Sequence, residues 1–158
     1  MDRSFLRRLL DAPGPSGFEV RPARVWRAEA ETFAESVAVD VNGNSTAAVR
    51  REGAPRVMMA GHVDEIGLQV THIDEEGYLY VDEIGGWDSQ VLVAQRVRVM
   101  AKDTDIPGVI GKKPIHLLET EERSKVTKTK QLWVDVGADD RDAVVELGIR
   151  VGDPMVLE

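Results

Sequence analysis

Hydrophobic positions near the amino terminus of this chain recur at helical intervals. A first helix is predicted by apolar side chains spaced three and four residues apart, Phe5, Leu6, Leu9 and Leu10. Pro13-Gly14-Pro15 ends that helix, and Ser16 with Glu19 is predicted to form a capping box for a second one. The apolar face of the second helix is predicted to comprise Ala23, Trp26, Ala30 and Phe33, with Trp26 in the core.

The period then changes to two. Residues 37–41 alternate between valine and other residues, Asn42-Gly43 is a turn signal, and residues 45–49 return as a second strand. The next apolar run, residues 57–60, is continuous, which predicts a strand buried on both faces. Ligands bind outside the carboxyl ends of such strands in open α/β sheets, so His62 is predicted to lie at a binding site. This region reads as the entry to an α/β sheet.

From Gly67 onward, short apolar segments alternate with turn residues, which predicts a small all-β barrel or sandwich. The strands are expected at residues 68–73, 78–81, 95–100, 109–110 and 132–136. Residues 139–147 predict one helix ended by Gly148, and the polar residues 117–130 predict an exposed loop. We place a boundary near residues 68–70, which gives domains 1–69 and 70–158.

Composition narrows the function classes. The 158 residues are 42% hydrophobic, enough for one ordinary domain or two small ones. A net charge of −8 argues against nucleic acid and anionic membranes as partners. The chain has no cysteine, which excludes disulfides and thiolate metal sites, and no apolar stretch of export-signal or membrane-spanning length. We therefore expect a cytoplasmic protein.

The candidate chemistry lies in His62-Val63-Asp64. His62 is a potential metal ligand, and Asp64 is placed to accept a hydrogen bond from its second ring nitrogen. The same spacing also fits a hydrogen-bonded histidine beside a turn. The pair alone does not decide between these interpretations.

Motifs on both sides of this pair carry a resemblance. They follow one another as Gly14-Pro15-Ser16-Gly17-Phe18-Glu19, Asp40-Val41-Asn42-Gly43-Asn44, Gly61-His62-Val63-Asp64-Glu65-Ile66-Gly67, Gly85-Gly86-Trp87, Gly108-Val109-Ile110-Gly111, Lys113-Pro114-Ile115-His116-Leu117-Leu118, Val134-Asp135-Val136-Gly137-Ala138 and Gly152-Asp153-Pro154. In this order and spacing, the chain resembles the amino-terminal part of the tetrahedral aminopeptidases, the metallopeptidase family of deblocking, glutamyl and lysyl aminopeptidases.

The resemblance implies an α/β metallo-exopeptidase domain, here its amino-terminal part, followed by a small β-barrel-like dimerisation domain. His62 would be a ligand in a site for two divalent metal ions (zinc, cobalt or manganese), and Asp64 would be the catalytic-site carboxylate that orients it. The family's other ligands and general base come from a segment after the β domain. We therefore expect the 158-residue chain alone to be inactive and to bind metal weakly, with Gly152-Asp153-Pro154 returning toward the catalytic domain.

Three functions stay open at this point. The first is a metal-dependent aminopeptidase that releases amino-terminal residues from peptides and self-associates as a homodimer or into a larger assembly. The second is a non-catalytic truncated fragment that acts as an oligomerisation module. The third, weaker function is a glucanase-type hydrolase, although no pair of acids can be placed across a glycosidic bond.

Several other residues have structural interpretations. Asp139-Asp140-Arg141 resembles the family's bridging-aspartate motif in letters, but its position at a helix start favours capping. His72 is predicted on a solvent face, and His116 is interpreted as a hydrogen-bonded structural histidine. Glu65 is not interpreted as catalytic. Core or interface anchors are predicted at Trp87 and Trp133, and a tight turn or close backbone approach at Gly85-Gly86.

Overall fold

The chain forms two compact units. The computed structural model describes residues 3–50 and 52–158, and these divide between Glu65 and Ile66. The boundary predicted between residues 69 and 70 lies farther along, inside strand β3 (Gly67–Ile73). Each unit has its own secondary structure and is described by itself.

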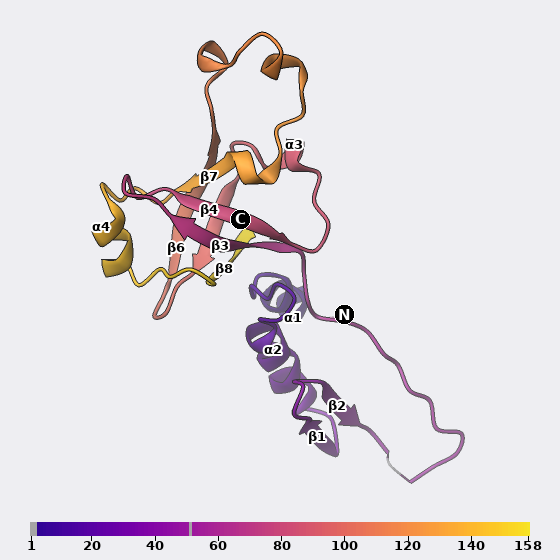
Figure 1. Ribbon diagram of the computed structural model, residues 1–158. Helices are drawn as coiled ribbons and strands as arrows, with labels where there is room; N and C mark the ends of the chain where they lie inside the picture. Colours follow the sequence, from indigo (N-terminus) through magenta and orange to yellow (C-terminus); the bar gives the residue numbers. More distant parts are fainter. Residues whose placement is uncertain (1–2, 51) are drawn as a thin grey trace. The chain divides into compact units, whose positions relative to one another are not determined.

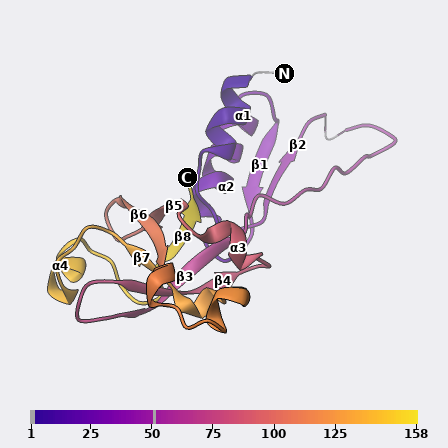
Figure 2. The same cartoon turned by 90° about the horizontal axis from the view of Figure 1, so that it is seen from above.

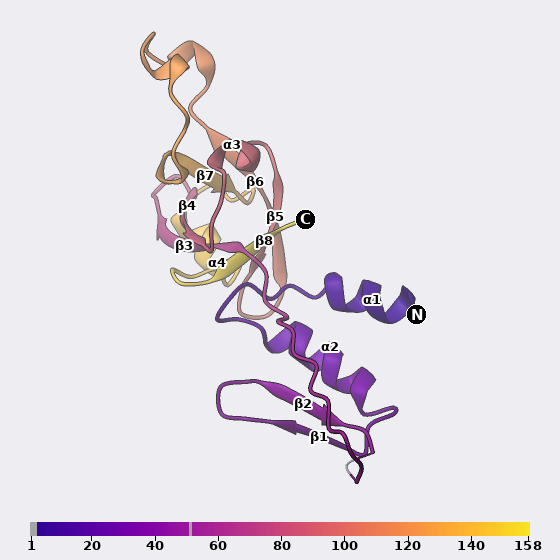
Figure 3. The ribbon, with the colours of Figure 1, turned by 90° about the vertical axis from the view of Figure 1, so that its right-hand side faces the viewer.

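The described part of the amino-terminal unit contains two helices and one hairpin, whose arrangement can be followed in Figures 2 and 3. Its elements are α1 (Arg3–Leu10), α2 (Val20–Ala30), β1 (Ser36–Val39) and β2 (Ser45–Ala48). Helix α2 contacts both α1 and β2. An ion pair of 2.9 Å between Arg8 and Glu29 joins the helices, and the Arg27 guanidinium donates to Ser45 Oγ of the hairpin at 3.0 Å. The predicted helices and hairpin are confirmed.

Two details of the predicted second helix are wrong. Helix α2 begins at Val20, so Glu19 occupies the N-cap position, and no side chain caps the helix there. Ser16 lies too far upstream to cap it, and Glu19 Oε1 instead accepts from the Gly17 amide at 2.7 Å. On the predicted apolar face, Ala23 and Ala30 are buried, but Trp26 is only half-buried and Phe33 is exposed.

The predicted doubly buried strand at residues 57–60 is also wrong. This segment is extended without strand pairing, and Val57, Met58 and Met59 are 81%, 88% and 94% exposed. A strand is buried on both faces only when neighbouring strands and covering layers are present. Within residues 3–50 and 52–65, the sheet consists of β1 and β2 paired with each other, so nothing covers these side chains.

The second unit is a closed six-stranded barrel (Figure 1). Around the barrel the strands are β3, β4 (Leu79–Ile84), β7 (Leu132–Asp135), β6 (Asp105–Lys112), β5 (Arg96–Met100) and β8 (Pro154–Leu157). All of the neighbouring pairs are antiparallel. This confirms the barrel alternative of the sequence prediction, since closure leaves no free sheet edge.

Strand β8 is a correction to the sequence prediction. The last strand predicted from the sequence is at residues 132–136, whereas residues 154–157 form a further strand that closes the barrel. Met155 pairs with Leu68 of β3 and also with Val99 of β5. The Gly152 amide donates to the Val70 carbonyl at 2.8 Å, which fixes the entry of the strand.

The barrel interior is filled by aliphatic side chains that alternate along the strands. The largest of the fully buried side chains are Leu68, Leu79, Leu92, Ile110, Leu132, Ile149, Met155, Val70, Val97, Val99, Val134 and Val144. Leu92 comes from the short helix α3 (Ser89–Leu92) and Val144 from α4 (Arg141–Glu146), so both helices pack onto the barrel. Burying each such side chain contributes about 1.5–3 kcal/mol.

A long excursion leaves the barrel between β6 and β7 (Figure 1). It contains the 3₁₀ turns η1 (Ile115–Leu117), η2 (Glu122–Ser124) and η3 (Thr129–Gln131), and most of its residues are exposed, as predicted. At its base the buried Thr129 hydroxyl donates to the Glu83 carboxylate. No helix in residues 3–50 or 52–158 is long and apolar enough to cross a membrane.

Candidate metal-ligand site

A backbone clamp brings two distant segments of the amino-terminal unit together. The Glu65 amide donates to the Gly14 carbonyl at 3.0 Å, and the Ser16 amide donates to the Glu65 carbonyl at 3.2 Å. The Glu65 carboxylate also accepts from the Gly14 amide at 3.0 Å. At Gly14 a Cβ would lie 2.4 Å from Pro22 Cγ, so only glycine fits this loop. Glu65 therefore has a structural role, because it holds these two segments together.

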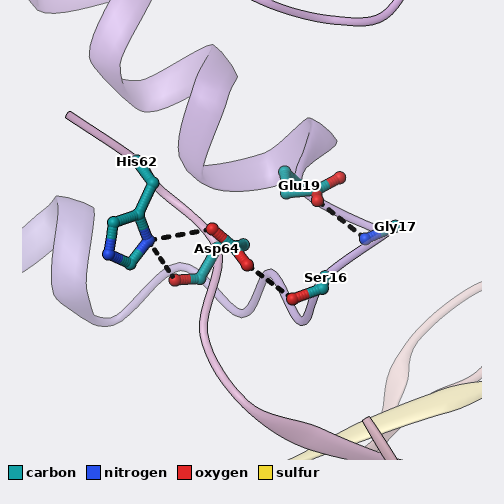
Figure 4. Close-up of polar contacts among 5 residues, drawn as sticks. All are labelled: Ser16, Gly17, Glu19, His62 and Asp64. Carbon is teal, nitrogen blue, oxygen red and sulfur yellow. Dashed lines mark hydrogen bonds and ion pairs between the residues drawn. The ribbon is translucent and has the colours of Figure 1, made fainter. Parts of the chain in front are cut away.

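The clamp places Ser16, His62 and Asp64 in one hydrogen-bonded chain (Figure 4). The two Asp64 carboxylate oxygens have different partners. Oδ1 accepts from His62 Nδ1 at 2.9 Å, and Oδ2 accepts from the Ser16 hydroxyl at 2.5 Å. The Asp64 carbonyl oxygen lies 3.2 Å from the same His62 nitrogen, as a second and longer acceptor.

These contacts set the charge of Asp64. Its pKa lies below the ordinary value of 3.8, first because the Ser16 hydroxyl donates to the carboxylate and second because His62 does. Each bond favours the ionised form over the protonated form. Asp64 is thus a carboxylate at neutral pH, and a carboxylate acceptor holds the proton of the neutral imidazole on Nδ1.

The arrangement leaves the other ring nitrogen available. The His62 side chain is 84% exposed, whereas that of Asp64 is 34% exposed. With its proton on Nδ1, the ring presents the Nε2 lone pair, which is the form that binds metal ions. Among the residues that the structure describes, no three histidine, aspartate or glutamate side chains gather to hold an ion. The chain therefore brings together one potential ligand and its orienting carboxylate.

The remaining histidines lie in the other unit. His72, on β3, is exposed as predicted, and its ring lies 5.9 Å from that of Tyr80. His116, in η1, is exposed and makes no hydrogen bond within the described part of the chain, so its interpretation as a hydrogen-bonded structural histidine is wrong.

The other sequence candidates have structural roles. Asp140 is the N-cap of α4, and its carboxylate accepts from the Ala143 amide at 2.8 Å, as the capping interpretation predicts. Trp87 packs against the barrel core and donates from Nε1 to the Gly67 carbonyl at 2.8 Å. Gly85 has a φ of +82°, and a Cβ there would lie 2.6 Å from Ile66 Cγ2, so the predicted close approach is present.

Sequence reasoning missed the contact between Ser16 and Asp64. It assigned Ser16 to helix capping, the common role of a serine that precedes a helix. The available signal was the joint occurrence of Pro15-Ser16-Gly17 and His62-Val63-Asp64 among the resembled motifs, which does not by itself indicate contact.

Comparisons with known proteins all find similarity to aminopeptidases. The profile of the family described as M42 glutamyl aminopeptidase matches residues 43–158. The chain is 36% identical to the lysyl aminopeptidase of Pyrococcus furiosus over 154 residues, which are 96% of this chain and 44% of that protein.

Solved structures of aminopeptidases, including the following two, are similar to almost the whole chain. A TET aminopeptidase from the marine sediment archaeon Thaumarchaeota archaeon SCGC AB-539-E09 has a TM-score of 0.93 and 39% identity, with 98% of this chain and 44% of that chain covered.

The second structure is the Pyrococcus horikoshii TET1 peptidase, which can assemble into a tetrahedron or a large octahedral shell. Its TM-score is 0.86 at 33% identity, and the match covers 99% of this chain and 46% of that chain. The present chain thus spans less than half the length of these relatives.

Proposed function

Because the chain belongs to the M42 glutamyl aminopeptidase family, we propose that it contributes a metal ligand to an aminopeptidase that releases amino-terminal residues from peptides. The observation that carries this proposal is the exposed His62 ring whose Nδ1 is bonded to Asp64. This is the geometry of a ligand histidine oriented by a carboxylate. The chain spans 44% of the Pyrococcus furiosus relative, so the proposal concerns the complete aminopeptidase.

The donor set fits a divalent ion in part. His62 Nε2 would be one ligand, and Asp64 would hold the ring in place and strengthen its basicity. Nitrogen and oxygen donors suit zinc, cobalt and manganese alike, and the absence of cysteine in the sequence removes thiolate ligands. When bound, such ions polarise a scissile carbonyl and activate water.

Variants of the complete aminopeptidase test the proposal. His62→Ala should abolish hydrolysis of aminoacyl p-nitroanilides and lower the metal content. Asp64→Asn should reduce metal affinity or turnover about 10–100-fold, because the amide cannot stabilise the ligand ring as a carboxylate does. His72→Ala is the matched control, since that ring is exposed on the barrel unit. Full activity and metal content in His62→Ala would refute the proposal.

The 158-residue chain allows a separate measurement. Catalytic zinc sites use about three protein ligands, but no three potential ligands lie together among the described residues. We therefore expect calorimetric titration of the chain with zinc or cobalt to show weak binding. Stoichiometric sub-micromolar binding that is lost in His62→Ala would mean that the chain itself completes the site.

We also propose that the barrel unit mediates self-association, as a homodimer or within a larger assembly. Support comes from the assemblies of the Pyrococcus horikoshii relative and from exposed apolar side chains on β6 and on the excursion. These are Val109, Ile115, Leu117 and Val126, which are 47%, 69%, 56% and 56% exposed. A polypeptide of residues 66–158 should sediment as a dimer. A monodisperse monomer at high micromolar concentration would rule this out.

A further inference from the structure

We infer that Ser16 is a positioning residue for the metal site, acting through Asp64 on the tautomer and orientation of His62. This inference rests on the proposed function of His62 as a ligand. It goes beyond the His62–Asp64 pair, because it assigns a role to a hydroxyl that comes from the loop before α2. The three side chains form one hydrogen-bonded chain. In it, Ser16 restrains the rotamer of Asp64, and Asp64 restrains the orientation of the His62 ring.

The two oxygens of the Asp64 carboxylate are held by different partners. If only His62 held Asp64, the side chain could rotate among its staggered rotamers and lose the imidazole bond. The Ser16 bond at 2.5 Å holds the opposite oxygen, so only the rotamer seen in Figure 4 satisfies both partners. Since Asp64 is partly exposed, packing alone does not supply this restraint.

Backbone hydrogen bonds hold Ser16 itself in place. Its amide donates to the Glu65 carbonyl at 3.2 Å, and Gly14 is bonded to Glu65 through both the backbone and the carboxylate. None of these bonds uses the Ser16 hydroxyl. The loop can therefore stay in place when the hydroxyl is removed, which makes the hydroxyl's contribution separable from folding. Glu19 does not compete for the hydroxyl, because its carboxylate accepts from the Gly17 amide.

The position of the Asp64 carboxylate determines which nitrogen of the His62 ring carries the proton. A carboxylate at Nδ1 keeps the imidazole proton there and leaves Nε2 free for a metal ion. Without Ser16, Asp64 should occupy the productive rotamer about one third of the time, if the three staggered wells become comparable. The longer contact to the Asp64 carbonyl would remain as a weaker acceptor. Ser16 should thus determine the tautomer ratio of His62.

The test is long-range ¹H–¹⁵N NMR of the metal-free 158-residue chain at about pH 9, where free imidazole is neutral. Ser16→Ala should lower the ratio of the Nδ1–H to the Nε2–H tautomer of His62 about threefold, toward the ratio in Asp64→Ala. Ser16→Thr keeps a hydroxyl and should restore the ratio. Ser45→Ala is the matched control, because that hydroxyl in the same unit is bonded to Arg27 rather than to Asp64.

The amide spectrum of the β1–β2 hairpin reports folding in each sample. If Ser16→Ala disturbs it, Ser16→Gly decides instead, because it also lacks the hydroxyl and keeps the backbone amide that donates to Glu65. A native His62 tautomer ratio in the folded Ala or Gly variant overturns the role of Ser16. The measurement needs neither metal nor catalysis, so it is separate from the proposed function, which fails only if His62→Ala leaves the complete enzyme active.

Discussion

Removal of the α4 cap tests whether Asp139 and Asp140 are structural. Asp140→Ala deletes the carboxylate that accepts from the Ala143 amide at 2.8 Å. An N-cap replacement of this kind costs about 0.5–2 kcal/mol. Helix α4 carries Val144, which is fully buried against the barrel, so we expect the loss to lower the stability of the whole barrel unit.

Asp139→Ala is a closely matched control. It also removes one negative charge next to the helix, but the Asp139 side chain makes no hydrogen bond within the described part of the chain. Both variants lose a favourable interaction with the helix dipole, about 0.3–1 kcal/mol at most. Their difference is therefore the capping bond, about 1 kcal/mol, which corresponds to roughly 4–8 °C in a unit of this size.

Circular dichroism during thermal and urea unfolding measures this difference, and titration with zinc or cobalt accompanies it. We expect the midpoint of Asp140→Ala to lie below that of Asp139→Ala, and metal binding to be unchanged in both. Equal midpoints would refute the capping argument. Loss of metal affinity in either variant would mean that the letter resemblance to a bridging-aspartate motif had been dismissed wrongly.

Three further predictions concern single contacts. Gly85→Ala should destabilise the barrel unit more than Gly137→Ala in thermal unfolding. Both glycines have positive φ, which alone costs about 1–2 kcal/mol, but only at Gly85 would the added Cβ clash, 2.6 Å from Ile66 Cγ2. The pKa of Asp40 is lowered from 3.8 mainly by the Asn44 side chain, so its support of the β1–β2 turn should be present above about pH 4 and lost as the pH falls through the lowered pKa. Carbon-13 NMR should show a higher Asp40 pKa in Asn44→Ala, and an unchanged value would contradict the assignment. Trp87→Phe should lower the free energy of unfolding in urea by about 1 kcal/mol, because it removes the hydrogen bond to the Gly67 carbonyl. Trp133→Phe is the control and should lower it less, because the new ring can still pack beside Tyr78.

The elements set by local pattern were predictable from the sequence. Alternation over residues 37–41 with Asn42-Gly43 predicted the first hairpin, and β3 with its following turn was predicted in the same way. Closure of the barrel was not predictable from local pattern, because β8 pairs with β3 and β5, which are distant in sequence. Residues 154–157 have the apolar character of a strand, but no strand was predicted there, because a run of four residues does not reveal which distant strands it pairs with.

The errors in the amino-terminal unit have a related cause. The apolar run at residues 57–60 satisfies every local criterion for a buried strand, but burial depends on other elements that pack against it, and the run is exposed here. Ser16 had a satisfactory local interpretation as a cap, whereas its hydroxyl bonds to Asp64, 48 residues away. The pairing of His62 with Asp64 was predictable because the two residues are close in sequence.

The order of strands in the barrel gives this unit a property of modular architecture. Its first strand, β3, and its last strand, β8, are antiparallel neighbours, with Leu68 opposite Met155 and Gln69 opposite Pro154. The chain thus enters and leaves the barrel about one interstrand spacing apart, roughly 5 Å. A unit with adjacent ends can be spliced into a surface loop of a host domain, or exchanged for a short turn, without stretching that host.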